Sequence, residues 1–220
     1  MVEAAAASFT ASQLIAISNS TTEPVDASGV TALSSDSISN IKTLLTAGND
    51  TAQFTAGSFG SLATVVVSDS TLSGSDLAEA IDQANTATTG TSATTVFTIT
   101  AAGEITGTEE DFTALIADEN AQQIDITNQN LTIDIGTTIS VATARTLSET
   151  TTGTVTGTIE SGTTIAAMLN ENTGLTETDA YTITIAAGDA EVTATNLTAL
   201  YGKTSVAVDA SAVTQITGTV

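Results

Sequence analysis

The chain has 220 residues and a formal net charge of −22, because 25 residues are acidic and only three are basic. This charge argues against nucleic acid as a partner, since phosphate binding needs a basic face, and no apolar run approaches the ~18 residues that a membrane-spanning helix needs. The absence of cysteine and histidine excludes catalysis by either residue and leaves any serine nucleophile without its usual base.

Seven short helices are predicted along the chain from apolar residues spaced three and four positions apart. The clearest is at 108–120, where Thr108 and Asp111 have the spacing of a capping box, and the acids of the first turn suit the helix dipole. These helices are too short to be stable alone and must pack on another layer. They cover residues 11–17, 35–46, 73–85, 108–120, 141–149, 163–172 and 193–202.

The other layer is predicted from runs of β-branched residues that largely alternate in period two. In the run at 181–186, for example, Tyr181, Ile183 and Ile185 share one face. The predicted strands cover residues 63–69, 94–100, 123–127, 131–136, 153–159, 181–186 and 206–211.

Strands and helices alternate along the chain, which is typical of parallel strands joined by helical crossovers. Because the units recur at loosely fixed spacing, we expect the α/β class, as a repetitive solenoid of parallel β-strands with short helices between coils. In such a fold each coil buries its face against its neighbours. A single non-repeating α/β domain is the alternative.

An internal repeat supports the repetitive interpretation. When the sequence is compared with itself, 9–34 aligns with 192–217 without a gap, and 11 of the 26 positions are identical. With this composition about 3 identities are expected by chance. We therefore expect one repeat domain over 1–220 in which the end units 9–34 and 192–217 are equivalent. Both units keep the apolar pattern of an interior coil, which predicts self-association or contact with flanking repeats of the same protein.

The phrases "TATNLTAL" and "VAVDASAVTQITGT" near the end of the chain resemble the Thr/Ala/Asp-rich repeats of very large bacterial, especially cyanobacterial, cell-surface proteins. The resemblance is strongest at 8–36 and 190–220 and is compositional between them. It implies an exported protein that is associated with adhesion, surface layers or motility, and often with calcium. The glycine-aspartate nonapeptide of calcium β-rolls is absent from this chain.

Calcium is the cofactor that the acidic composition favours, because it takes six to eight oxygen ligands that turns can supply. The alternative for these acids is structural: helix capping near Asp76 and local Asx turns at Asp26 and Asp209. The candidate metal ligands are Asp26, Asp69, Asp76, Asp118, Glu119 and Asp209.

These observations predict a non-enzymatic protein. A pair of carboxylates can hydrolyse glycosides, but such sites usually carry aromatic platforms and basic residues, and aromatic residues form 3% of this chain. We expect a structural or adhesive repeat module of a bacterial extracellular fibre, surface layer or stalk that associates end to end. The alternative is a domain that binds a glycan or a protein, with calcium stabilising it. The start of the chain has no secretory signal, so we expect any export signal to lie outside it.

Overall fold

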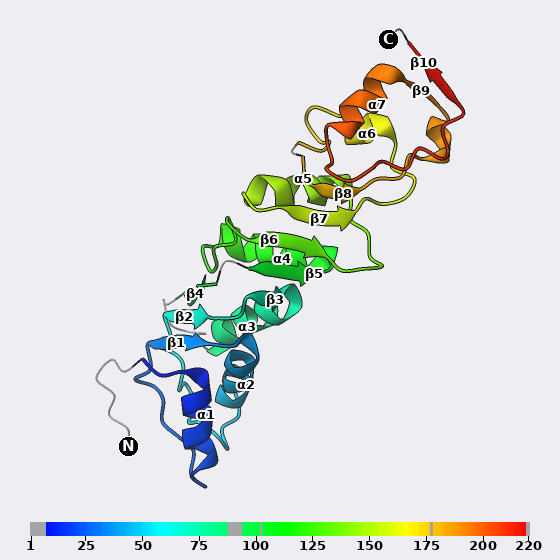
Figure 1. Ribbon diagram of the computed structural model, residues 1–220. Helices are drawn as coiled ribbons and strands as arrows, with labels where there is room; N and C mark the ends of the chain where they lie inside the picture. Colours follow the sequence, from blue (N-terminus) through cyan, green and yellow to red (C-terminus); the bar gives the residue numbers. More distant parts are fainter. Residues whose placement is uncertain (1–7, 88–93, 102, 177, 219–220) are drawn as a thin grey trace. The chain divides into compact units, whose positions relative to one another are not determined.

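The computed structural model describes residues 8–87, 94–101, 103–176 and 178–218. Over these residues the chain has a mixed α/β fold with seven α-helices and short parallel strands (Figure 1). Contacts group the chain into two compact units, where the sequence predicts one repeat domain. The first unit comprises residues 1–103 and 114–126, and the second comprises 104–113 and 127–220.

In the first unit, three strands form a parallel sheet in the order β1-β2-β4 (Figure 1). Ala32 lies opposite Thr64, and Thr64 lies opposite Val96, so successive strands pair at a constant interval along the chain. The elements of this unit are α1 (Ala11–Asn19), β1 (Ala32–Asp36), α2 (Ile38–Gly48), β2 (Thr64–Val67), β3 (Thr71–Ser73), α3 (Gly74–Ala87) and β4 (Val96–Ile99).

The core of the first unit combines aliphatic helix faces with an aromatic pair. The rings of Phe54 and Phe59 lie 5.2 Å apart between centroids and are tilted by 55°, a geometry that aromatic pairs prefer. Both rings are buried, as are Ile41 and Leu44 of α2 and Leu77 of α3. Burial of these faces supplies the stability that such short helices lack on their own.

In the second unit, β5, β6, β7 and β8 pair in parallel in that order, and β9 pairs in parallel with β10. The interval between partners is shorter than in the first unit, since Leu131 lies opposite Val155 and Thr156 lies opposite Ala180. Helix α4 (Glu109–Asn120) contributes residues to both units. The other elements are β5 (Glu104–Gly107), β6 (Asn130–Ile133), α5 (Val141–Thr150), β7 (Val155–Thr158), α6 (Ile165–Met168), β8 (Ala180–Thr182), the 3₁₀ helix η1 (Ala187–Asp189), β9 (Glu191–Thr193), α7 (Ala194–Tyr201) and β10 (Gln215–Thr217).

Several helices begin at an acidic side chain that comes from another part of the chain. The carboxylate of Asp36 accepts a hydrogen bond from the backbone N–H of Ser12 in α1, at 2.8 Å. Ile165 at the start of α6 likewise donates its backbone N–H to Asp189, at 2.7 Å. Because the first N–H groups of a helix have no partner within it, these carboxylates satisfy the helix start and complement its dipole. These acidic residues therefore have a structural use.

All seven predicted helices are found within the described residues, although α6 is only four residues long. The predicted capping box is confirmed: Asp111 Oδ2 accepts from the backbone N–H of Thr108 at 2.8 Å, and Thr108 Oγ1 accepts from the N–H of Asp111 at 3.3 Å. Two predicted strands are wrong. In 123–127 and 206–211 only isolated bridges form, at Ile124 and Asp209.

The prediction of a repetitive solenoid is also wrong. In the described residues the strands fall into three separate sheets, β1-β2-β4, β3-β5-β6-β7-β8 and β10-β9, and no single ladder runs through all of them. One physical reason is that the strands are very short. In addition, the pairing interval is not uniform, because Ala32 pairs with Thr64 in the first unit but Leu131 pairs with Val155 in the second. The fold is therefore a mixed α/β arrangement with several parallel sheets.

Candidate functional site

The predicted metal ligands Asp26 and Asp209 lie in matching exposed turns. Asp26 Oδ1 accepts from the backbone N–H of Ser28 at 3.0 Å, and Asp209 Oδ1 accepts from that of Ser211 at 2.9 Å. The pKa of Asp26 is lowered by its side-chain and backbone hydrogen bonds with Ser28, and the pKa of Asp209 by the corresponding bonds with Ser211. Each carboxylate thus closes an Asx turn.

Asp69 and Asp76 serve the helices of the first unit. Asp69 Oδ2 accepts from the backbone N–H of Ile38 at the start of α2, at 2.7 Å. Asp76 forms an ion pair with Lys42 at 2.6 Å, and Glu79 binds the same ammonium group at 2.6 Å. These two hydrogen-bonded carboxylates raise the pKa of Lys42. Both predicted residues therefore have partners from the chain itself.

Asp118 and Glu119 are neighbours on α4 but differ in their surroundings. Glu119 accepts from the backbone N–H of Ile126 at 2.8 Å. Burial raises the pKa of Asp118 to about 6, and the negative charge of Asp82 adds to the effect. Across the described ranges, no group of three or more Asp and Glu side chains has the arrangement of a metal site. The six predicted ligands are thus not brought together in one place.

The strongest feature of the molecule is that residues 9–34, here called the N-terminal repeat, and residues 192–217, the C-terminal repeat, share several local contacts. Thr10 caps α1 by accepting from the N–H three residues on, as Thr193 does for α7. A backbone bond from Val30 to Ala27, at 3.0 Å, recurs from Val213 to Ala210, also at 3.0 Å. All of these positions correspond in the gapless alignment of the two segments.

Strand pairing follows the same correspondence. Phe9 lies opposite Leu33 in a parallel bridge, and Val192 lies opposite Ile216 in the β9–β10 pair. Because the same length of chain joins the partners in each pair, helix, turn and returning strand have kept their combined length in both repeats. The identical residues found in the sequence therefore fix a common local structure.

The two repeats differ in what covers them. Leu33 is 1% exposed because β1 pairs with β2, which places Val65 opposite it. Its counterpart Ile216 is 62% exposed, and within the described residues β10 pairs with β9 alone. The C-terminal repeat thus presents an apolar side chain and a strand edge that the N-terminal repeat buries.

A buried polar network that sequence reasoning missed lies in the second unit. Asp179 is 6% exposed. Its two carboxylate oxygens accept from the Ser148 hydroxyl at 2.6 Å and from the backbone N–H of Val155 at 2.8 Å. Tyr181, also buried, contacts the Ser148 hydroxyl at 2.8 Å and donates to the Ala144 carbonyl at 2.9 Å. Burial raises the pKa of Tyr181, so the phenol stays protonated as a donor.

Ser148 and Asp179 also border an open groove of about 620 Å³. Its other lining residues are Glu149, Thr151, Thr152, Gly153, Thr154 and Thr178. Several of the hydroxyls already donate to backbone carbonyls, as Thr151 does to Gln129 at 2.6 Å. They can still accept hydrogen bonds. The groove is therefore lined by polar groups whose positions are fixed by hydrogen bonds to the backbone. No pattern around Asp179 in the sequence distinguishes it from the other acids.

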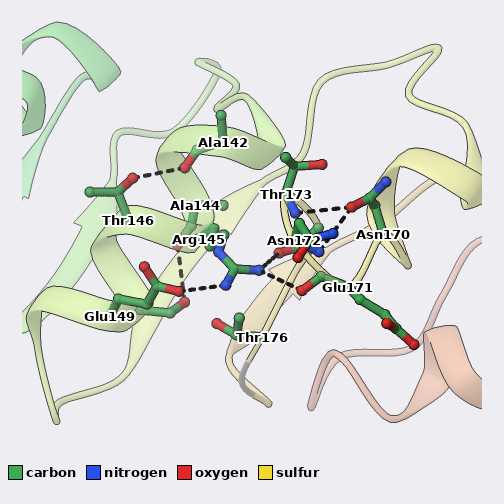
Figure 2. A network of polar contacts seen from close by, with 12 residues as sticks. Ala142, Ala144, Arg145, Thr146, Glu149, Asn170, Glu171, Asn172, Thr173 and Thr176 are labelled. Carbon is green, nitrogen blue, oxygen red and sulfur yellow. Dashed lines mark hydrogen bonds and ion pairs between the residues drawn. The ribbon is translucent and has the colours of Figure 1, made fainter.

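Figure 2 shows how Arg145 of α5 holds the loop at 170–174. Its guanidinium forms an ion pair with Glu149 at 2.8 Å and donates to the carbonyls of Gly174 at 3.2 Å and Glu171 at 3.4 Å. The loop is braced from within by Asn170, whose side-chain oxygen accepts from two backbone N–H groups.

The other two basic residues are also bound internally: Lys42 contacts Asp76 and Glu79, and Lys203 donates to the Thr176 carbonyl at 3.2 Å. The positive charges of the chain thus serve its own fold. In the described ranges, no helix has both the length and the apolar character that crossing a bilayer requires.

Comparison of the chain with protein-family models, with curated proteins and with solved structures finds no match.

Proposed function

We propose that the chain is a structural or adhesive repeat module of a bacterial extracellular fibre, surface layer or stalk, and that it associates end to end. The observation that carries this proposal is the recurrence of the same capped helix, turn and strand pair in the N-terminal and C-terminal repeats. A module that repeats its own local structure offers equivalent surfaces for neighbours. Its partners are then further copies of itself or flanking repeats of the same protein.

The internal use of charged groups supports a structural role over a catalytic one. Asp36, Asp69 and Asp189 bind helix starts, and Arg145 and Lys42 bind the chain's own groups. The cell-surface location rests on the resemblance of the repeat phrases to those of large exported bacterial proteins.

Calcium enters this proposal through electrostatics. Copies of a chain with a net charge of −22 repel one another, and salt or divalent cations weaken that repulsion. Calcium therefore promotes association by neutralising carboxylates at the surface, with no dedicated cage required.

Sedimentation velocity and negative-stain microscopy test the proposal. We expect a monomer at low salt, and larger linear species at high salt or in millimolar calcium. Magnesium at equal ionic strength is the matched control for a specific effect of calcium. A monomer under every condition would refute end-to-end association.

Binding of a glycan is a second candidate function, and the groove bordered by Ser148 and Asp179 is the observation that favours it. Its hydroxyl and carboxylate lining suits the hydroxyls of a saccharide. We expect Thr154→Val, at an exposed position of the groove, to abolish glycan-array binding, and Thr198→Val on α7 to leave it intact. The absence of any glycan signal for the unaltered chain would remove this candidate.

A further inference from the structure

The uncovered face of the C-terminal repeat has a definite counterpart in the same chain. In the N-terminal repeat, the equivalent face is covered by residues 54–65: Val25 pairs with Phe54, the N–H of Ala27 binds Ser58, and Leu33 lies opposite Val65. Ala27 and Val30 are accordingly buried. The counterparts Ala210 and Ile216 are exposed, and Val213 is only half-buried. These three apolar residues of the C-terminal repeat are therefore not buried by any described part of the chain.

The pairing register indicates what can cover this face. Phe9 pairs in parallel with Leu33, and Val192 pairs in parallel with Ile216 in the same way. In each repeat the earlier segment of the chain lies beside the later one. A second copy that places its own Phe9 beside Ile216 would therefore continue the ladder Val192, Ile216, Phe9, Leu33 in the parallel sense already present within each repeat. Phe9 is itself only half-buried, so its ring has surface left to bury.

Charge favours this particular pairing within a highly acidic chain. Residues 215–217 and 8–11 contain no charged side chain, so the two edges approach without placing like charges opposite each other. In addition, the N-terminal repeat has a small notch of about 20 Å³. Its lining is mostly apolar, with Phe9, Leu14, Ile17 and Val25, and also includes Asp26. An aliphatic side chain at the contact extends this apolar lining.

We propose that the partner of β10 is a second copy of this chain, whose residues 8–10 add to the open edge of β10 as a parallel strand, with Phe9 of the second copy beside Ile216. This inference rests on the end-to-end association proposed above and names the surfaces that produce it. Addition of a strand to an open edge supplies backbone hydrogen bonds, and the apolar pair supplies the register. Because the contact joins two different surfaces, it propagates from copy to copy.

Disulfide trapping tests the register directly, since the chain has no cysteine of its own. In the proposed pairing Ser8 of one copy lies opposite Gln215 of the next, and opposed positions on paired strands lie within the Cα range of a disulfide. The variant Ser8→Cys/Gln215→Cys, oxidised under associating conditions, is expected to give a ladder of covalent multimers on a non-reducing gel. Ser8→Cys/Ile135→Cys is the control, because Ile135 is fully exposed but lies far from β10 in sequence. It is expected to give no ladder.

A second experiment tests the same contact without introducing cysteine. We expect Ile216→Asp to weaken association in sedimentation about tenfold or more while leaving the melting temperature unchanged, because the side chain is already exposed. Ile135→Asp is the matched control and is expected to leave both unchanged. Association of the unaltered chain without a Ser8–Gln215 ladder, and with no effect of Ile216→Asp, would overturn this inference but not the proposed function. A strict monomer would overturn both.

Discussion

The backbone N–H of Ser12 donates a hydrogen bond to the carboxylate of Asp36, 2.8 Å away, although the two residues are far apart in the sequence. The same carboxylate accepts from the N–H of Ser37 and from the side chain of Asn40, both at 2.8 Å. Asp36 thus joins the start of α1 to the end of β1 and the start of α2.

Replacement of Asp36 by alanine is expected to lower the free energy of unfolding by about 1–2 kcal/mol, because two helix starts lose an acceptor. Burial acts to raise the pKa of Asp36, but the hydrogen bonds from Asn40, Ser12 and Ser37 outweigh it and the pKa is lowered from 3.8. The contribution is therefore present above pH 3.8 and is lost as the pH falls through the lower folded pKa.

Urea unfolding at neutral and acidic pH measures this effect. Glu23→Ala is the control, because Glu23 is an exposed acid outside any helix, and it should change stability little. An Asp36→Ala variant as stable as the unaltered chain at pH 7 would contradict the capping role.

The network around Asp179 predicts a larger effect. Asp179→Ala removes the acceptor of both the Ser148 hydroxyl and the Val155 N–H in a buried setting, so we expect a loss of about 2–4 kcal/mol in unfolding free energy. Asp179→Asn keeps the shape and one acceptor oxygen, and its loss should be smaller. Equal losses for the two variants would contradict a role for the retained acceptor oxygen and would indicate that the negative charge, which both variants remove, dominates at this position.

Asp118 is predicted to destabilise the fold at neutral pH. Its folded pKa of about 6 lies above the usual 3.8, so the folded chain disfavours the charged carboxylate above pH 6 and the penalty disappears as the pH falls toward 3.8. Asp118→Asn should therefore raise the unfolding free energy at pH 7, by about 1 kcal/mol once the partial exposure is allowed for.

The melting temperature from pH 4 to 8 checks this sign. The difference between Asp118→Asn and the unaltered chain should be largest above pH 6 and should vanish near pH 4. Asp82→Asn, which removes the neighbouring negative charge, should shift the pH dependence in the same direction but by less. A destabilised Asp118→Asn at pH 7 would contradict the prediction.

Gly153 marks a close approach of two backbone segments. A Cβ at this position would clash with the carbonyl of Gln129, and a backbone group cannot move aside as a flexible side chain can. We expect Gly153→Ala to cost about 1–3 kcal/mol. Gly188→Ala is the matched control, because nothing lies within 4 Å of the added atom. Comparable thermal stability for the two variants would contradict the close approach.

The helices could be predicted from the sequence because their causes are local. Thr108 and Asp111 are separated by less than one helical turn, and the apolar stripe that follows can be read directly. Strands form only when they hydrogen-bond to other strands, and the local sequence pattern does not show which distant segment provides those bonds. The pattern at 35–46 predicts helix from its first residue, yet β1 occupies Ala32–Asp36 because β2, which begins only at Thr64, supplies its hydrogen bonds.

The candidate site shows the same division. The gapless alignment of 9–34 with 192–217 identifies the two repeats, but only the structure distinguishes a covered Leu33 from an exposed Ile216. The acidic composition predicts calcium ligands. The actual hydrogen bonds of these acids, such as that between Asp69 and Ile38, depend on three-dimensional neighbours. Asp179 could not be found because burial, and not residue type, makes it unusual.

The two tyrosines give the chain a pair of built-in optical probes. The chain has no tryptophan, so its intrinsic fluorescence comes from Tyr181, which is buried beside Ser148, and from Tyr201, which is 69% exposed on α7 of the C-terminal repeat. Iodide can quench the exposed ring while the buried one is shielded until the fold opens. Quenching of the native chain therefore reports on the surface of α7 in the C-terminal repeat, and the change in quenching on denaturation reports on the core, with no label attached.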